Sequence, residues 1–549
     1  MHPADLTPLA PFLSDVTLQA PWALLERFRT LPREHPDEVR RAALEIIGRL
    51  AALGVPVTME EPDLHLSVPK RAGVSATGRA WRARALSGSR SSPSGVTAPL
   101  VSVSIQPDPE TGVAEGPFPD LRGKFALTTA PVTGAVLDLL RKHGSLGVIA
   151  AGAESGSGST ALRRGAPEEP GLVAVAVSDG DAPSLIERAR AAEWATVTTE
   201  LTEGWFRSPV PLVRIAGTGE PGPFVLLHGH YDSRGPGVRD NALGTAGLLE
   251  IARVMWKHRD RLRRSVWIAW WPGHVTGADA GCTWFADRYA IDLYERCIAR
   301  IGCLSPGLRG AAEYTAVPAM SEAGPWIRSV IQEVAGRTAG VRRPSGAAPF
   351  DPIGISGCLE EPLGVPDRPG EEMDSLEVVD RHRLLTDIRI HLAAAAGLAN
   401  ETIAPLDFRR TTEEFAATLR RYQRAAGKHA SFEPVLAEVA ALEQRLDRLA
   451  EHCASLGRRS VTDPWVRRAN AALRRLGRLL VPVNFTPGAG PSADTGRARL
   501  PLPDLAPALE LSRTSPDRRA HLQEPLLRGR NRVVQALRDA SAVVRSAMP

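Results

Sequence analysis

The sequence has few cysteines, no long hydrophobic run and no leader-like start. Its five cysteines form no C-x-x-C pair and are odd in number, which fits buried thiols in a reducing compartment better than a disulfide framework. No uninterrupted run of about 18 apolar residues occurs, so no membrane-spanning helix and no membrane partner are expected. The N-terminal segment, MHPADLTPLAPFLSDVTLQAPW, lacks a basic region followed by an apolar one. We therefore expect a cytoplasmic protein.

Charge of one sign is not in large excess. The formal net charge is +5, only five residues are lysines, and the many arginines are interspersed with acids. Since no basic block with interleaved aromatic residues is visible, nucleic acid is not an expected partner. The chain has 549 residues, 43% of them hydrophobic. This length predicts a globular protein of about three domains rather than one core.

The most informative stretch is FVLLHGHYDSRGPGVRDNALG, residues 224–244. An apolar strand leads into His230, Asp232 follows, and a Gly/Pro-rich loop brings Asp240 to the start of an apolar helix. Open α/β sheets build their sites at such positions, and an imidazole with a carboxylate suits Zn²⁺. Asp232 would accept the other ring N–H of His230 and fix its tautomer. In the alternative interpretation, Asp240 only caps the helix and His230 makes a loop hydrogen bond.

The order His-Tyr-Asp-Ser, followed by Asp-Asn-Ala-x-Gly at a helix start, resembles a family of zinc exopeptidases. The family includes bacterial leucyl aminopeptidases, glutamate carboxypeptidase II and the transferrin receptor. The resemblance follows most of the chain in order, with its sharp motif in residues 224–244. It implies that His230 binds one zinc ion and that Asp240 bridges two. It also implies an α/β fold with a mixed-sheet core of the zinc-exopeptidase, phosphorylase/hydrolase-like type.

This resemblance and the pattern of residue types along the sequence divide the chain into four segments. The core takes residues 1–85 and 206–405, and its first clear helix is expected from Asp37, as N-cap, to Leu53. Residues 86–205 alternate Val/Ala/Ile-rich segments with glycine-rich turns and short helices, one of them at 134–143. This β-rich insert resembles a protease-associated domain.

The last segment, residues 406–549, reads as an all-α domain that ends in a helix at 530–547. Apolar residues recur there at spacings of four and three, which predicts a bundle or dimer helix: Val435, Val439, Leu442, Leu446, Leu449 and Cys453. A bundle within one chain is the commoner explanation for so short a repeat. The family resemblance, in which a C-terminal helical domain builds a dimer, implies a homodimer.

The later catalytic positions depart from the family pattern. By an ungapped count, His274 stands at the position of the general base and Val275 at that of a zinc ligand. Leu304 stands where the pattern has an aspartate ligand, and Gly370 where it has the last histidine. Because each ligand of a metal pair must be ionised and correctly oriented, one imidazole and one carboxylate would not hold two ions. A two-zinc site is therefore not expected.

His274 leaves three interpretations open. It joins His230 and Asp240 as the third ligand of a single zinc ion, or it acts as a base without metal, since its ordinary pKa of about 6.5 suits that role. In the third interpretation it is a loop histidine packed beside Trp270 and Trp271. Acidic residues of neighbouring loops are further candidates to replace the missing ligands: Glu360, Glu361, Glu371, Glu372 and Asp374.

Two classes of function follow. The favoured one is a relative of the zinc exopeptidases that has lost the two-zinc peptidase site and binds a peptide, small molecule or partner as a scaffold. The other is a divergent hydrolase of peptide or amide bonds with one metal at His230, Asp240 and His274. The first is favoured because loss of a ligand and of the general base removes two contributions of about 3 kcal/mol or more each.

Overall fold

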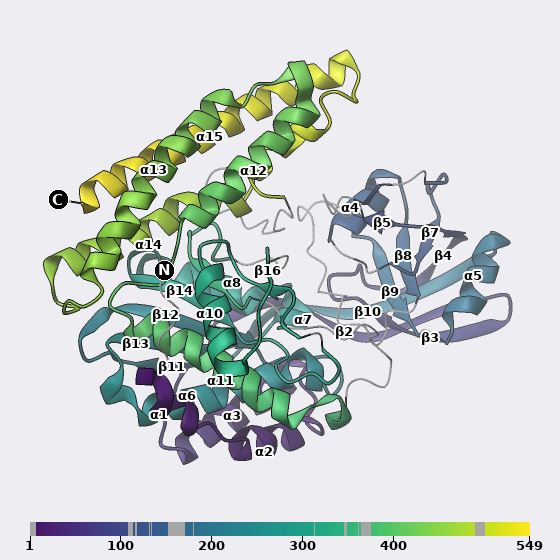
Figure 1. Cartoon of the computed structure of the whole chain (residues 1–549). Coiled ribbons are helices and arrows are strands. Elements are labelled where there is room, and N and C mark those ends of the chain that lie inside the picture. The colour runs from purple at the N-terminus through teal and green to yellow at the C-terminus, as the bar shows by residue number, and fades with distance from the viewer. Residues whose placement is uncertain are drawn as a thin grey trace.

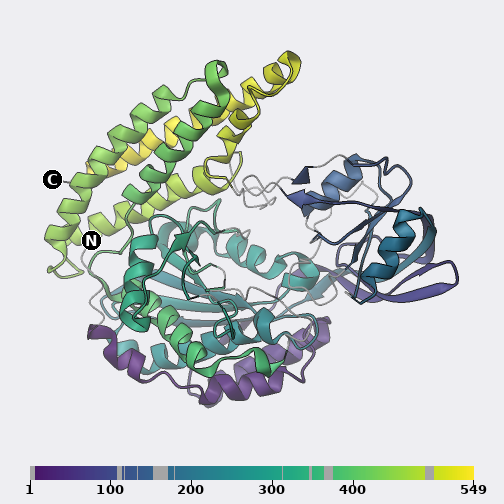
Figure 2. The same cartoon turned by 45° about the vertical axis from the view of Figure 1, so that its right-hand side comes forward.

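The computed structural model describes residues 7–107, 114–115, 118–130, 132, 134–151, 171–178, 180–311, 313–344, 349–360, 362–363, 375–488 and 500–548. It has an α/β body, a β-barrel beside it and a bundle of long helices above it, as Figures 1 and 2 show from two sides. No helix among these residues is long and apolar enough to cross a membrane. The expected α/β class with a mixed sheet is confirmed.

A six-stranded sheet forms the centre of the α/β body, in the order β1-β11-β13-β12-β14-β17. Neighbours β13, β12, β14 and β17 are parallel, whereas β11 runs antiparallel to both β1 and β13. The strand bounds are β1 (Thr58–Glu60), β11 (Val210–Ile215), β12 (Glu220–His230), β13 (Arg264–Trp271), β14 (Cys297–Gly302) and β17 (Ser356–Cys358).

Both faces of this sheet are covered, which explains why β12 reads as a continuous apolar run. Val225 and Leu227 join the large core with α1 (Ala10–Ser14), α2 (Gln19–Phe28), α3 (Pro36–Ala52), α6 (Leu243–Lys257), α10 (Gly324–Ala335) and α11 (Arg381–Asn400). Phe224 and Leu226 point to the other face, where α8 (Ala280–Arg288) and α9 (Ala290–Arg296) pack. Successive side chains of a strand alternate in this way because of its pleat.

Helix α3 begins at Pro36, with His35 at the N-cap, so the expected N-cap role of Asp37 was wrong. Proline has its φ already set for the first helical turn and lacks the N–H that would stay unpaired there. The side chain of Glu38 accepts a hydrogen bond from the His35 N–H at 3.0 Å. These two features fix the start of the helix at Pro36, one residue before Asp37. Asp37 therefore lies inside the first turn.

The barrel is closed by strands in the order β10-β2-β3-β9-β8-β7-β4. Residues 63–85, which were expected in the core, form β2 and β3 of this barrel. The reason is that β2 pairs antiparallel with β10 along its whole length. Bounds are β2 (Asp63–Ala76), β3 (Arg79–Ala85), β4 (Ser92–Ser102), β7 (Phe125–Thr128), β8 (Gly147–Ala151), β9 (Val173–Val177), β10 (Trp194–Arg207), α4 (Gly134–Lys142) and α5 (Ala182–Arg190). The identity of this barrel as a protease-associated domain stays a prediction.

Within residues 409–488 and 500–548, four long helices make up the bundle: α12 (Arg409–Ala426), α13 (Glu433–Leu456), α14 (Pro464–Phe485) and α15 (Pro516–Ala547). The expected apolar seam lies on α13, and its valines and leucines from Val435 to Leu449 are buried within the chain. The last helix starts 14 residues earlier than expected because Ser515 caps it and Pro516 occupies its first turn. The homodimer stays a prediction.

The remaining elements are short. They are β5 (Gln106–Pro107), β6 (Ala114–Glu115), β15 (Val317–Pro318), β16 (Val341–Arg342), α7 (His274–Gly277), the irregular helical turn η2 (Val238–Ala242), and the 3₁₀ turns η1 (Thr7–Leu9), η3 (Arg259–Arg261), η4 (Leu376–Val378), η5 (Gly427–His429) and η6 (Pro503–Leu509). Two of them, η2 and α7, follow the carboxyl ends of the neighbouring parallel strands β12 and β13. They carry the side chains of the candidate site.

Candidate metal centre

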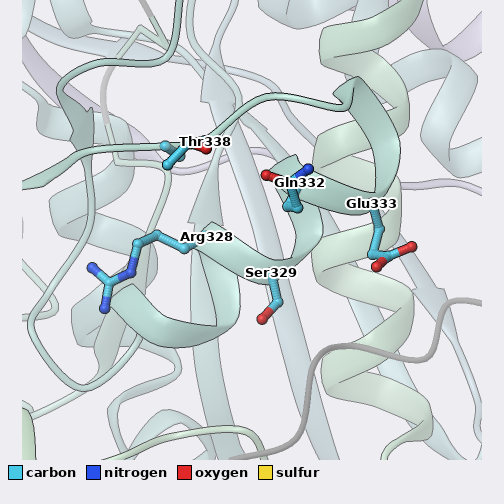
Figure 3. Close-up of a pocket in the computed structure, with 6 residues that line it drawn as sticks. Arg328, Ser329, Gln332, Glu333 and Thr338 are labelled. Atoms are coloured by element: carbon cyan, nitrogen blue, oxygen red, sulfur yellow. The ribbon is translucent and has the colours of Figure 1, made fainter.

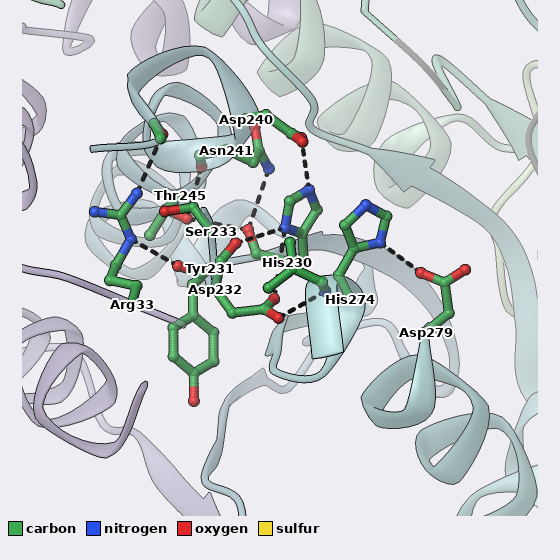
Figure 4. Close-up of polar contacts among 12 residues, drawn as sticks. Arg33, His230, Tyr231, Asp232, Ser233, Asp240, Asn241, Thr245, His274 and Asp279 are labelled. Carbon is green, nitrogen blue, oxygen red and sulfur yellow. Dashed lines mark hydrogen bonds and ion pairs between the residues drawn. The ribbon is translucent and has the colours of Figure 1, made fainter. Parts of the chain in front are cut away.

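His230 is the last residue of β12 and is 7% exposed. Its Nε2 lies 3.0 Å from Oδ1 of Asp240, and its Nδ1 lies 3.0 Å from the main-chain oxygen of Asp232 (Figure 4). The Asp232 carboxylate is farther from Nδ1, at 3.6 Å, and its Oδ2 accepts the Val275 N–H at 3.0 Å. The main chain of Asp232 therefore contacts the ring more closely than the carboxylate expected there.

Asp240 does not cap the helix that follows. It lies in η2, and α6 begins at Leu243 without a side-chain cap. The Asp240 carboxylate points instead to His230 (Figure 4). The alternative interpretation of this residue as a helix cap is therefore wrong, and the two residues singled out by the sequence do meet.

Asn241 holds the turn that presents Asp240. Its side-chain N–H groups donate to the main-chain oxygens of His230 and Cys303 at 3.2 and 3.1 Å. Its Oδ1 accepts the N–H groups of Gly244 and Ser305 at 3.1 and 3.0 Å. Because Asn241 is fully buried, this one side chain ties the ends of β12 and β14 to the start of α6.

Replacing Asn241 with alanine is expected to lower the free energy of unfolding by about 2–4 kcal/mol, since several buried polar groups would lose their partners. Chemical denaturation followed by circular dichroism measures this change. Asn531 is exposed on α15, and its replacement by alanine should change stability by less than about 0.5 kcal/mol. Equal effects of the two replacements would contradict the assigned role of Asn241.

His274 opens α7 directly after β13, and its ring stacks on that of His230 with centroids 3.9 Å apart and planes at 21°. Its Nδ1 lies 2.5 Å from Oδ1 of Asp279 (Figure 4). The ring that stacks on Trp271 belongs to His228, with a centroid distance of 4.5 Å. His274 thus faces the site rather than the tryptophans.

Among the described residues, one group of three or more histidine, cysteine or acidic side chains is arranged so that it could hold a metal ion. It consists of His230, Asp240 and His274, whose candidate ligand atoms all lie within 4.8 Å of one another. Two imidazoles and one carboxylate are the ligand types of many catalytic zinc sites. The residues therefore fit a single ion.

Strong charge coupling holds the site together. Burial alone would lower the pKa of His230, but the Asp240 and Asp232 carboxylates outweigh it and raise that pKa to about 10. Burial would raise the pKa of Asp240, yet the charge of His230 holds it well below its usual range. A metal ion would therefore compete with a proton for His230, because only the neutral ring binds metal.

The positions where the family pattern has other ligands do not supply them here. Val275 is 5% exposed, and its contribution is the main-chain N–H that Asp232 accepts. Leu304 lies half-buried in the turn after β14. Glu360 is committed elsewhere, since its Oε2 accepts Nε of the buried Arg300 at 2.8 Å. The other acidic candidates and the last expected ligand position lie outside the described residues: Glu361, Gly370, Glu371, Glu372 and Asp374.

A surface pocket of about 230 Å³ lies elsewhere, along α10 (Figure 3). Its lining consists of Arg328, Ser329, Gln332, Glu333, Thr338 and Ala339. None of the candidate metal ligands lines it. This pocket is therefore separate from the chemistry at the edge of the sheet.

The fold matches solved aminopeptidases and peptidases, one of them described as a zinc enzyme. An aminopeptidase from Aneurinibacillus sp. strain AM-1 superposes with a TM-score of 0.51 and 19% identity over 71% of this chain and 95% of its own. BSAP, a zinc aminopeptidase from Bacillus subtilis, gives 0.53 and 19% over 69% and 94%. A peptidase M28 precursor from Shewanella amazonensis SB2B gives 0.55 and 17% over 72% and 96%.

Sequence comparison gives shorter matches. The mouse aminopeptidase NAALADL1 is 38% identical over 91 residues, which is 16% of this chain and only 12% of that protein. Residues 212–285, which include His230, Asp240 and His274, match the profile of peptidase family M28. The expected resemblance is thereby confirmed: the chain carries a peptidase family M28 segment within the fold of the zinc aminopeptidases.

Proposed function

We propose that this protein is a zinc aminopeptidase-like homologue that has lost two-zinc peptide hydrolysis, keeps a site for one metal ion and binds a peptide or small molecule there. The observation that carries the proposal is the convergence of His230, Asp240 and His274 on one place. A bound zinc ion would supply a Lewis acid to a ligand's carbonyl or carboxylate oxygen. The protein's own part is to hold two imidazole rings and one carboxylate toward it, and the ion would displace the proton from His230.

The side chains at the second metal position support a single ion. A metal pair about 3.5–4 Å apart needs several carboxylates to balance four positive charges. In the described part of the chain, Val275 and Leu304 stand at two of those ligand positions, and neither side chain can coordinate a metal. Glu360 neutralises Arg300 instead of an ion. One carboxylate, Asp240, balances one zinc ion better than two.

His274 would have to serve both as a metal ligand and as a general base, and this conflict supports the loss of peptidase chemistry. As a ligand it uses Nε2, while its Nδ1 is already engaged by Asp279. A ring with both nitrogens occupied cannot accept the proton of an attacking water. General-base catalysis contributes about 10²–10⁴-fold in rate, so a metal-loaded site of this kind would hydrolyse peptides poorly. Binding without turnover is the function that remains.

A single-metal hydrolase of peptide or amide bonds is the second candidate. It is favoured by the number of ligands, because three protein ligands leave a fourth position open for water, as in catalytic zinc sites. In that case a group other than His274 has to take the proton. The same assay separates the two candidates.

The test is to load the purified full chain with zinc, remove loosely bound ion by dialysis, and measure metal per chain and turnover of an aminoacyl p-nitroanilide. We expect close to one zinc ion per chain and no turnover above that of a His230→Ala variant. Close to two ions per chain would refute the single-ion site. One ion together with zinc-dependent turnover would establish the hydrolase instead.

A further inference from the structure

We infer that Asp279 is a positioning residue for the metal centre, which holds His274 in the tautomer and orientation that direct its Nε2 toward His230 and Asp240. The inference rests on the proposed single-metal site and deepens it. Asp279 is absent from the ligand set itself. It acts through His274, which its carboxylate contacts (Figure 4).

The contact defines which ring nitrogen carries the proton. Asp279 Oδ1 lies 2.5 Å from His274 Nδ1, and an ionised carboxylate only accepts hydrogen bonds. Nδ1 must therefore be the N–H in this contact, so Nε2 of the neutral ring keeps its lone pair. A carboxylate in this position fixes the tautomer and the orientation of the ring. The stacked ring of His230 at 3.9 Å limits rotation from the other side.

Asp279 makes this contact in place of its ordinary local role. It stands at the N-cap of α8, where aspartate normally accepts an N–H of the first helical turn. Here no side-chain capping hydrogen bond is made, and the carboxylate reaches back five residues to His274 instead. The local sequence would favour the cap, so the contact with His274 reflects the tertiary arrangement.

The backbone around Asp279 is bent to allow this contact. Ala278 has a φ of 48° and Asp279 a φ of 68°, two successive non-glycine residues in the left-handed region. Such conformations cost free energy, and they gather at functional sites where the surrounding structure over-determines them. Gly273 at φ 76° forms the other side of the same turn. The turn between β13 and α8 is thus shaped to place a carboxylate beside His274.

Two variants of Asp279 and one matched control test the inference. Asp279→Ala removes the contact, and Asp279→Asn keeps the shape but removes the charge. Asp287→Ala removes an exposed carboxylate from the same helix, away from His274. Zinc affinity is measured by competition with a chromophoric chelator, and the protonated nitrogen of His274 by ¹⁵N NMR of the metal-free, histidine-labelled protein. Thermal melting checks that each variant is folded.

We expect Asp279→Ala to weaken zinc binding by about 10–100-fold and to shift the His274 proton away from Nδ1. Asp279→Asn should also weaken zinc binding, by a factor several times smaller than that of Asp279→Ala. Asp287→Ala should change neither the affinity nor the tautomer. Wild-type affinity and tautomer in Asp279→Ala, or wild-type affinity in Asp279→Asn if alanine prevents folding, would overturn the inference. A general loss of negative charge would weaken binding equally in Asp287→Ala, which would also overturn it.

A His274→Ala variant separates this inference from the proposed function. If zinc affinity is unchanged in His274→Ala, His274 is not a ligand and the proposed single-metal site itself fails. If His274→Ala weakens binding while Asp279→Ala does not, the site stands and only the role of Asp279 is refuted.

Discussion

Replacement of Arg300 by methionine is expected to lower the free energy of unfolding by roughly 3–5 kcal/mol, the usual cost of removing one partner from a buried ion pair. Arg300 lies on β14 and is fully buried. Its Nη2 is 2.7 Å from Oδ1 of Asp351 and from Oε2 of Glu360. Without the guanidinium, two buried carboxylates would lose the cation that both of them contact, and urea denaturation measures the result.

Two controls make the result specific. Adding Asp351→Asn and Glu360→Gln to Arg300→Met removes the two negative charges that Arg300 contacts and should recover a large part of the lost stability. Arg528→Met breaks an ion pair with Glu524 whose side chains are 73% and 71% exposed, and should cost no more than about 1 kcal/mol. If Arg300→Met costs no more than Arg528→Met, the buried cluster does not stabilise the fold as described.

Replacement of His230 by alanine is expected to weaken zinc binding by at least about a hundredfold, more than the loss of a residue that only orients a ligand. The imidazole supplies one of three candidate ligand atoms, and Asp240 would lose its nearest partner as well. Chelator competition on the full chain measures the affinity. Circular dichroism confirms that the fold is kept.

His228 provides the matched control for this replacement. It lies two residues earlier on the same strand, so its side chain points to the same face. Its ring stacks on Trp271, its Nε2 lies 3.9 Å from Oε1 of Glu360, and burial with the nearby Arg300 charge lowers its pKa. His228→Ala should leave zinc affinity within a fewfold of wild type. Equal losses in both variants would mean that the ion does not bind at His230.

Features that depend on neighbouring residues were predictable from the sequence. The apolar run before His230, the glycine-rich loop and the apolar helix after Asp240 gave the strand, the turn and α6 in their correct order. The seam on α13 was predictable for the same reason, since periodicity reports which face of a helix is buried. The meeting of His230 with Asp240 followed from the position of both at one edge of the sheet.

Features that depend on distant residues were not predictable. Arg300 and Glu360 are 60 positions apart, and nothing in either segment marks them as partners. Residues 63–85 alternate like any strand, so their membership of the barrel emerges only from the pairing of β2 with β10 and of β3 with β9, two strands that come much later in the chain. Asp279 looks like an ordinary helix cap in the sequence. Only the left-handed turn before α8 directs it to His274.

The long pair of strands β2 and β10 gives the barrel a mechanical connection to the ion site. The first half of β2 packs against α8, where Leu64, Leu66 and Val68 contact Ala280 and Trp284. The contact is tight, because a methyl group added at Gly277 would lie 2.6 Å from Leu66. A swing of the barrel would therefore press on the turn that carries His274. The contact of β2 with α7 and α8 thus links the placement of the barrel to that of His274.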